Sequence, residues 1–204
     1  MAAVDSASTG THSSGKYTPK LPIGIGRQTF HEKNTTVTQN DSPLSLLRRL
    51  SNGLYVVGVA HGIKRGGFTA AWITQVSFDP LLVALSVNPG HASFPLLTGA
   101  GAFAISILGQ GQLELARHFG TQSGRSIDKF ATQRWQPAAG GAPVLSDAIA
   151  YLDCRIVACH PAGDHELMLS EVVGGAILTE DVLPMNYAET GNLDGSAALY
   201  PPRF

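Results

Sequence analysis

One histidine stands where an ionisable ring can meet a ligand. His165 lies between two carboxylates, Asp164 and Glu166, directly after a Pro161–Asp164 segment whose composition is typical of a compact turn. An imidazole changes its charge near neutral pH, so at the mouth of a hairpin it can contact and polarise a bound molecule. A lone surface histidine more often has no such role, and a second group is needed to support this one.

The two cysteines raise the possibility of a disulfide or of a metal site shared with His160 and His165. Cys154 and Cys159 are five residues apart in a predicted strand, and an odd separation places their side chains on opposite faces. They are therefore not expected to bridge each other. The Cys-x4-Cys spacing on an extended strand also lacks the tight knuckle of structural zinc sites. We expect two ordinary small residues and no metal.

Two other short motifs match known chemistry only in part. Gly109-Gln110-Gly111 follows a predicted strand, but Glu114 holds the third glycine position of the dinucleotide fingerprint, where it would obstruct helix packing and repel a pyrophosphate. Ser126 and Lys129 have the Ser-x-x-Lys spacing of penicillin-binding enzymes, but the companion motifs of that class are missing. Neither a Rossmann site nor an acyl-transfer site is predicted.

The segment Thr69–Thr74 combines small residues and hydroxyls with one large ring. Trp72 is by default a core or interface residue, because aromatic rings on strands usually pack. Its small and hydroxylated neighbours would let a planar ligand lie close to the backbone and receive neutral hydrogen bonds. Glu171, on another apolar strand, is expected to face outward, because burying an unpaired carboxylate is costly.

The composition excludes several classes of protein. The 204 residues carry 14 Lys plus Arg against 15 Asp plus Glu, with no basic run longer than Arg48-Arg49, so no nucleic acid partner is expected. Residues 80–113 contain no Asp, Glu, Lys or Arg, but proline and glycine break them into strand-sized lengths that do not suit a membrane span. The N-terminus does not resemble a secretory signal, and the expected location is cytoplasmic.

Short hydrophobic runs separated by turn residues predict a mainly β chain with flanking helices. A turn is expected over 62–67, and the Pro161–Asp164 turn joins the last two runs into a hairpin. The number of runs favours a barrel or a sandwich. The predicted strands cover residues 54–60, 68–78, 81–87, 102–108, 149–160 and 166–178.

Helices are expected at three places around these strands. Ser42 caps a first helix that has Pro43 at its first position and ends at Gly53. Two further helices, over 112–119 and 125–130, are expected to lie outside the sheet.

The chain is predicted to consist of an arm and one folded domain. Residues 1–40 are rich in Ser, Thr and Gly and have no sustained hydrophobic period, which indicates an arm that is partly disordered or draped on a neighbouring subunit. Residues 41–204 are long enough to enclose a core of their own.

A series of short segments in this domain follows a recognisable order. They are Ser51–Val57, Phe68–Trp72, Thr74, Val76–Leu81, Ala102–Leu108, Leu115–Phe119, Gly141–Leu145, Ala150–Cys154 and Ala162–His165. Together they cover about residues 42–180 and resemble the flavin reductase-like family, whose fold is the FMN-binding split β-barrel. The combination of Ala-Ala-Trp with Gly-Asp-His is especially similar to the reductase domain appended to flavodiiron proteins.

The resemblance implies a flavin, FMN or FAD, held by the second strand and by the turn after the third. It also implies a homodimer. The Gly163–His165 turn matches the family's nicotinamide-side motif, which implies that His165 is the catalytic group beside the hydride donated by NADH or NADPH. Carried over position by position, the flavin contacts are Thr69, Ala70, Ala71, Trp72, Thr74, Ser86, Val87, Asn88, His91 and Ser93.

One part of the flavin site departs from the family pattern. Family members often carry a basic residue just after the third strand, whereas this chain has Asn88-Pro89-Gly90-His91 there. Neutralisation of the flavin phosphate would then fall to His91, Lys129, Arg125 or backbone amides. Near the flavin ring, Thr74 or Ser93 is expected to donate a hydrogen bond to N5 or N1.

The function implied by the resemblance is that of an NAD(P)H:flavin oxidoreductase. Such an enzyme passes hydride from a nicotinamide to the flavin and supplies reduced flavin, or electrons, to a partner such as a monooxygenase. The cofactor carries this chemistry, so the lack of a catalytic triad is no objection. Two alternatives stay open: an electron-transfer module that holds FMN without nicotinamide activity, and a split barrel that has lost flavin.

Overall fold

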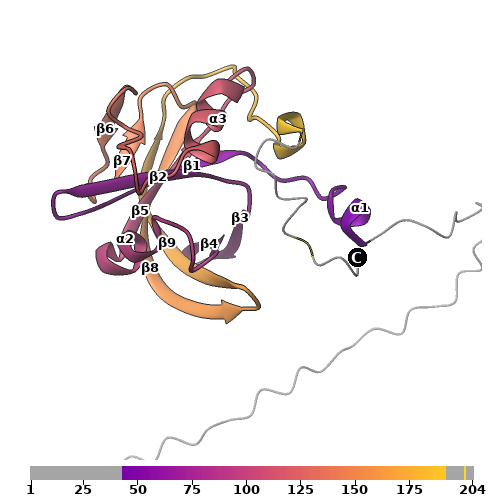
Figure 1. The fold of residues 1–204 in the computed structure, drawn as a ribbon, viewed down its shortest axis with the longest axis horizontal. Helices are drawn as coiled ribbons and strands as arrows, with labels where there is room; N and C mark the ends of the chain where they lie inside the picture. The colour runs from indigo at the N-terminus through magenta and orange to yellow at the C-terminus, as the bar shows by residue number, and fades with distance from the viewer. Residues whose placement is uncertain (1–42, 192–199, 201–204) are drawn as a thin grey trace, which may run out of the picture. The chain divides into compact units, whose positions relative to one another are not determined.

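The computed structural model describes residues 43–191 and residue 200 (Figure 1). The arm predicted over residues 1–40 and the capping residue Ser42 lie outside this part of the chain. The elements, in chain order, are α1 (Pro43–Leu47), β1 (Tyr55–His61), β2 (Lys64–Ala70), β3 (Ile73–Phe78), β4 (Leu81–Val87), α2 (Phe94–Ala100), β5 (Ala102–Ile107), α3 (Leu113–Thr121), β6 (Trp135–Pro137), β7 (Pro143–Leu145), β8 (Ala150–Ala162), β9 (His165–Ile177) and the 3-10 helix η1 (Tyr187–Thr190).

Seven antiparallel strands form one sheet whose two edge strands are consecutive in the chain. The strand order is β2-β1-β5-β8-β9-β4-β3, and only Ala71 and Trp72 separate β2 from β3. Three Cα-to-Cα steps span at most about 11 Å. In a flat sheet of this order the two edges would lie about 29 Å apart, at roughly 4.8 Å per strand. The sheet must therefore curl until its edges almost meet, which is the geometry of a split barrel.

Strand β1 is buried on both faces and divides the core in two. Val57 and Val59 point into one cluster, which also contains Leu97 of α2. Val56, on the opposite face, joins a second cluster with Phe119 of α3 and Phe130. This separation follows from the alternation of side chains along a strand. Figure 1 shows the two helices on either side of the β1–β2 hairpin.

The predicted fold class is confirmed, and most of the predicted strands are confirmed with it. Strand β4 has the predicted bounds, 81–87, and β5, β8 and β9 agree with the prediction to within two residues. The last two strands pair as a hairpin, and Gly163 has a φ of 70° at its turn, where glycine is favoured. Helix α3 also agrees with its predicted range, 112–119, to within two residues.

Three predictions of secondary structure are wrong. The single strand expected over 68–78 is two strands, because at Ala71 the chain leaves one sheet edge and at Ile73 joins the other. The turn expected over 62–67 is shorter, because β2 begins at Lys64. No helix forms over 125–130: the Asp128 carboxylate accepts a hydrogen bond from the Phe130 amide and fixes a turn instead.

The helices at the start of the domain and after β4 also differ from expectation. Helix α1 ends at Leu47, well before Gly53, and Leu46 and Leu50 are exposed, so its apolar face has no core contact to extend it. Helix α2 was not predicted, because Pro95 and the uncharged residues around it lack a clear helical period. Among the described residues, no helix is both long and apolar enough to cross a membrane.

The packing of β1 against β7 gives a test of the barrel. A Cβ placed on Gly58 would lie 2.0 Å from the Pro143 carbonyl oxygen, a backbone atom that cannot easily move. We expect Gly58→Ala to lower the free energy of unfolding by about 2 kcal/mol or more, measured by urea denaturation. The matched control is Gly99→Ala, in helix α2, where a Cβ would make an ordinary contact with His61. That change should be neutral or slightly stabilising, and equal effects of the two substitutions would contradict this packing.

Candidate functional site

The break between β2 and β3 lies beside the ends of β4 and β9. The Ser86 amide donates a hydrogen bond to the Trp72 carbonyl oxygen over 3.1 Å, and Val87 pairs with Glu166 in the sheet. The Trp72 and His165 rings consequently meet, with their centroids 5.0 Å apart. Trp72 is 51% exposed, so of the two default interpretations, core or interface, the first is wrong. About half of this residue is left for another group.

The neighbouring carboxylate orients the His165 ring. His165 Nδ1 lies 2.8 Å from Asp164 Oδ1, and the hydrogen bond and charge of His165 lower the pKa of the Asp164 carboxyl. An ionised carboxylate accepts the Nδ1 proton and leaves Nε2 for another partner. Trp72 is the second group that supports a binding role for His165. Its ring contributes a flat apolar surface beside the imidazole.

The turn after β4 presents His91 in a defined tautomer. The Gly90 amide donates to Asn88 Oδ1 over 2.8 Å, and the Ser93 amide donates to His91 Nδ1 over 3.1 Å. The His91 ring also packs on Phe68, with centroids 4.6 Å apart. Because Nδ1 accepts a hydrogen bond, the proton of the neutral ring is on Nε2, which is left to donate to a ligand.

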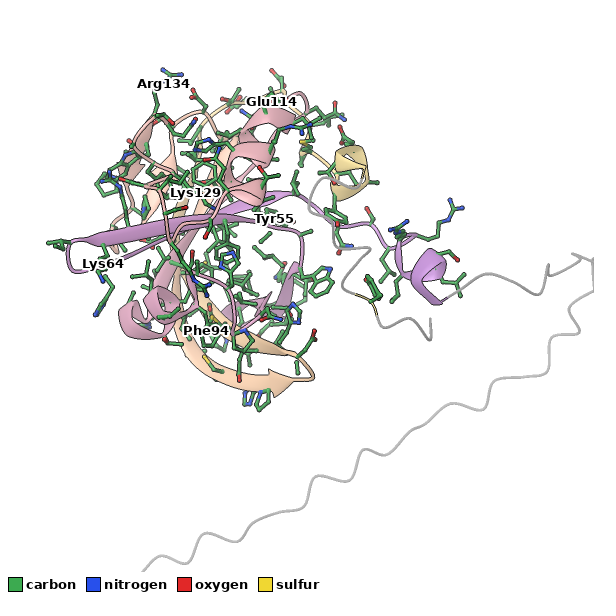
Figure 2. All side chains as sticks on the ribbon, viewed as in Figure 1. Tyr55, Lys64, Phe94, Glu114, Lys129 and Arg134 are labelled. Atoms are coloured by element: carbon green, nitrogen blue, oxygen red, sulfur yellow. The ribbon has the colours of Figure 1, made fainter. Side chains whose placement is uncertain are left out.

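Two cations face this histidine from the segment after α3. Lys129 is 3% exposed, and its Nζ donates to the Phe119 carbonyl oxygen over 2.6 Å beside α3 (Figure 2). The Arg125 guanidinium donates to the Gly90 carbonyl oxygen over 3.1 Å. Burial lowers the pKa of Lys129 to about 8. Burial, followed by the charges of Lys129 and Arg125, lowers the pKa of His91.

Three of the side chains predicted to neutralise a flavin phosphate influence one another, although they come from two separate segments. The charges of Lys129 and Arg125 both act on His91, and Arg125 also contacts the turn that carries it. The positive charge belongs to Lys129 and Arg125, whereas His91 is held toward its neutral form and offers one N–H. A phosphate fits this set, because a buried ammonium and a guanidinium provide charge-assisted donors for its oxygens.

The small and hydroxylated residues of the β2–β3 segment have different environments. The Thr69 hydroxyl donates to the Ala116 carbonyl oxygen over 2.7 Å, so it ties β2 to α3. Ala70 is buried and Ala71 is half-buried, so both keep this stretch of backbone free of bulky side chains. Thr74 is exposed on β3.

Ser93 is buried at the start of α2 and faces β2. A Cβ on Gly66 would lie 3.2 Å from its hydroxyl oxygen, so a larger residue at that position would crowd the hydroxyl. Gly67 likewise has the Phe119 and Phe130 rings where a Cβ would be. Sequence reasoning missed both glycines, because their neighbours come from distant segments.

The remaining sequence candidates lie outside this site. Cys154 and Cys159 are free; burial, together with the nearby Asp153 charge, raises the pKa of the Cys154 thiol to about 12. Glu171 faces outward, as predicted, and forms an ion pair with Arg155 on the neighbouring strand. No cluster of three or more metal-ligating side chains occurs in the part of the chain that the structure describes.

A separate groove runs along α3, and one of its lining residues, His118, contacts the Lys129 carbonyl oxygen over 2.7 Å. Its lining comes from α3 and three loops: Gly111, Gln112, Glu114, Leu115, Arg117, His118, Thr121, Gln122, Gln133 and Asp147. None of the residues predicted from the resemblance lines it. The predicted contacts therefore lie at the sheet break and at the turn after β4, outside this groove.

The chain belongs to the flavin reductase-like family. Its residues 47–194 match the family described as the flavin reductase like domain. The split-barrel sheet and the segments that carried the resemblance fall within this range.

Individual relatives agree with this assignment. The chain is 31% identical over 146 residues to diflavin flavoprotein A 1 of Synechocystis sp., covering 71% of this chain but only 26% of that protein. It is similar in structure to the NADH:FAD oxidoreductase SgcE6 of Streptomyces globisporus, with a TM-score of 0.65, 32% identity and coverage of 69% of this chain and 84% of that one. Nitrilotriacetate monooxygenase component B from Mycobacterium thermoresistibile is also similar, with a TM-score of 0.62, 27% identity and coverage of 66% and 74%.

Proposed function

We propose that this protein is an NAD(P)H:flavin oxidoreductase that uses FMN or FAD. The observation that carries the proposal is an aromatic pair and a cationic group that both adjoin the end of β4. The Trp72 and His165 rings lie 5.0 Å apart beside the sheet break. In the turn after β4, the Arg125 guanidinium donates to the Gly90 carbonyl oxygen, and the charges of Lys129 and Arg125 act on His91. A flavin has two matching parts, because its planar ring carries a phosphate at the end of the ribityl chain.

The residues have distinct parts in this proposal. Lys129 and Arg125 bind the phosphate, and His91 donates to it through Nε2. Backbone groups of Ala70, Ala71 and of the β4 end at 86–88 hold the ring, with Trp72 beside it. The bound flavin supplies the ring that accepts hydride from a nicotinamide. Ser93, buried against β2, and Thr74, on β3, remain the proposed hydroxyl donors toward that ring.

His165 is the proposed contact for the nicotinamide. Its Nδ1 is engaged by Asp164, so Nε2 can hydrogen-bond the carboxamide of NADH or NADPH. The Trp72 ring limits water beside that nitrogen and gives the nicotinamide an apolar edge. The protein thus positions two rings and excludes water, and it needs no nucleophile of its own.

A second copy of the chain and a redox partner are part of the proposal. Edge strand β3 and its turn expose apolar side chains, with Val76 at 49%, Phe78 at 90% and Leu81 at 44% exposure, which suits burial against another subunit. We propose a homodimer on this basis and from the family resemblance. The similarity to a monooxygenase component supports a monooxygenase as one acceptor of reduced flavin.

An anaerobic absorption experiment tests the proposed function. Purified protein is mixed with FMN or FAD, and then with NADH or NADPH. A shifted flavin spectrum that bleaches within seconds, far faster than free flavin with the same nucleotide, is the expected result. Flavin binding without bleaching would instead assign an electron-transfer module, and absence of binding would refute both functions.

The lowered pKa of Lys129 predicts how flavin binding depends on pH. A phosphate dianion binds the ammonium form, so FMN affinity should fall as pH rises through about 8, the value in the free protein. We expect the FMN dissociation constant to rise about tenfold or more between pH 7 and 9.5, measured by quenching of flavin fluorescence. Riboflavin, which has no phosphate, should bind equally at both pH values. Lys129→Met should weaken FMN binding at pH 7 and abolish its pH dependence; an unchanged profile in this variant would rule out the ammonium as the phosphate contact.

The proposed role of His165 gives a separate prediction. His165→Ala should lower kcat/KM for the nicotinamide about 10- to 100-fold, as expected for losing a hydrogen bond to the substrate, while the FMN dissociation constant stays the same. His160→Ala is the matched control, because His160 is exposed on the same hairpin. Unchanged steady-state kinetics in the His165 variant would remove this residue from the site, and a loss of FMN binding would reassign it to the flavin.

A further inference from the structure

The segment that carries both cations has no regular secondary structure to hold it. Residues 122–134 connect α3 to β6 through turns only. A side chain in such a segment is positioned by the contacts that its neighbours make. The contacts that matter here are made by three consecutive residues, Asp128, Lys129 and Phe130. Their side chains have different neighbours.

Arg65 on β2 holds this segment from the barrel side. Its Nε donates to Asp128 Oδ1 over 3.2 Å, and its Nη2 donates to Asp128 Oδ2 over 2.5 Å, a bidentate pair. The same guanidinium lies 4.7 Å from the centroid of the Trp135 ring, just after the segment ends. One side chain of the sheet therefore contacts the middle of the segment and the strand that follows it.

The Asp128 carboxylate transmits this constraint to Lys129. Oδ1 also accepts a hydrogen bond from the Phe130 amide over 3.0 Å, which closes a turn around Lys129. The Phe130 ring is buried against Phe119, with centroids 4.9 Å apart. With the residues on both sides fixed, Lys129 extends inward and its Nζ reaches the Phe119 carbonyl oxygen.

Arg65 also removes an electrostatic conflict. The Arg65 hydrogen bond is the main cause of the lowered pKa of Asp128, so this carboxyl is ionised and paired. Without Arg65, a free carboxylate would lie next to the lysine in sequence, where it would compete for the ammonium and repel a phosphate.

We propose that Arg65 is a positioning residue for phosphate recognition: its bidentate pair with Asp128 sets Lys129 in place without touching the ligand. The proposal rests on the proposed function, since it takes the Lys129 ammonium to be a flavin phosphate contact. It assigns a role in binding to two residues that lie outside the family-derived contacts. Phosphorylated flavins depend on this pair, and riboflavin does not.

The test compares FMN with riboflavin on the full chain. Dissociation constants are measured by flavin fluorescence quenching for Arg65→Ala, Arg65→Lys, Asp128→Asn and the double variant Arg65→Ala/Asp128→Asn. Arg155→Ala is the matched control, because Arg155 also forms an exposed cross-strand ion pair, with Glu171, on the β8–β9 hairpin. Thermal unfolding of each variant checks that it folds, and Arg65→Lys retains the charge if Arg65→Ala does not fold.

We expect Arg65→Ala and Asp128→Asn to raise the FMN dissociation constant about three- to tenfold, with riboflavin changed less than about twofold. Arg65→Lys should be intermediate, because an ammonium cannot form the bidentate pair. The double variant should bind FMN no more weakly than Arg65→Ala alone, and the pH dependence of FMN binding should flatten in all of them.

Other outcomes overturn the proposal in distinguishable ways. If Arg65→Ala weakens FMN binding and Asp128→Asn does not, Arg65 contacts the phosphate itself. Equal losses for FMN and riboflavin would indicate a purely structural role, and unchanged affinities would indicate none. If the unmodified protein binds neither flavin, the proposed function fails first, and the positioning role fails with it.

Discussion

The structure depends on a chain-length constraint: two residues join opposite edges of a seven-stranded sheet. Ala71 and Trp72 cannot span the width of a flat sheet, so the sheet curls until β2 and β3 are close. Curling in turn creates an enclosed face, which the apolar side chains of the strands and Leu97 of α2 fill. The uncharged segment 80–113 contributes β4, α2 and β5 to this part of the fold.

The same constraint explains where the candidate site lies. Between β2 and β3, the Ala71–Trp72 backbone leaves one edge of the sheet. These two residues belong to neither strand. Trp72 is half-exposed there, and the ends of β4 and β9 bring Ser86 and His165 beside it. In a barrel without this break, a paired strand would cover Trp72. The exposure of Trp72 is thus a consequence of how the sheet closes.

Charge is scarce in this domain, and the ionic contacts described join side chains that are exposed or half-buried. Arg155 with Glu171 and Arg134 with Asp147 are examples. Lys129 is different, because its ammonium is buried and its hydrogen bond is to a neutral carbonyl oxygen. Burying a cation without a counter-charge is costly, which is expressed in its lowered pKa. A phosphate would supply the missing anion, and this cost is the physical reason for proposing Lys129 as a ligand contact.

The amino-acid sequence by itself determined the β-rich class, the bounds of β4 and the β8–β9 hairpin, because alternation and turn residues are local properties. Its ordered motifs also identified the family, and they predict Trp72, His165 and the 86–93 region as site residues. Only the tertiary structure decided that 68–78 is two strands and that Lys129 is buried beside His91. It alone revealed the Arg65–Asp128 pair, whose partners are 63 residues apart. These features depend on which distant segments meet when the sheet curls, and no local pattern of residues encodes that meeting.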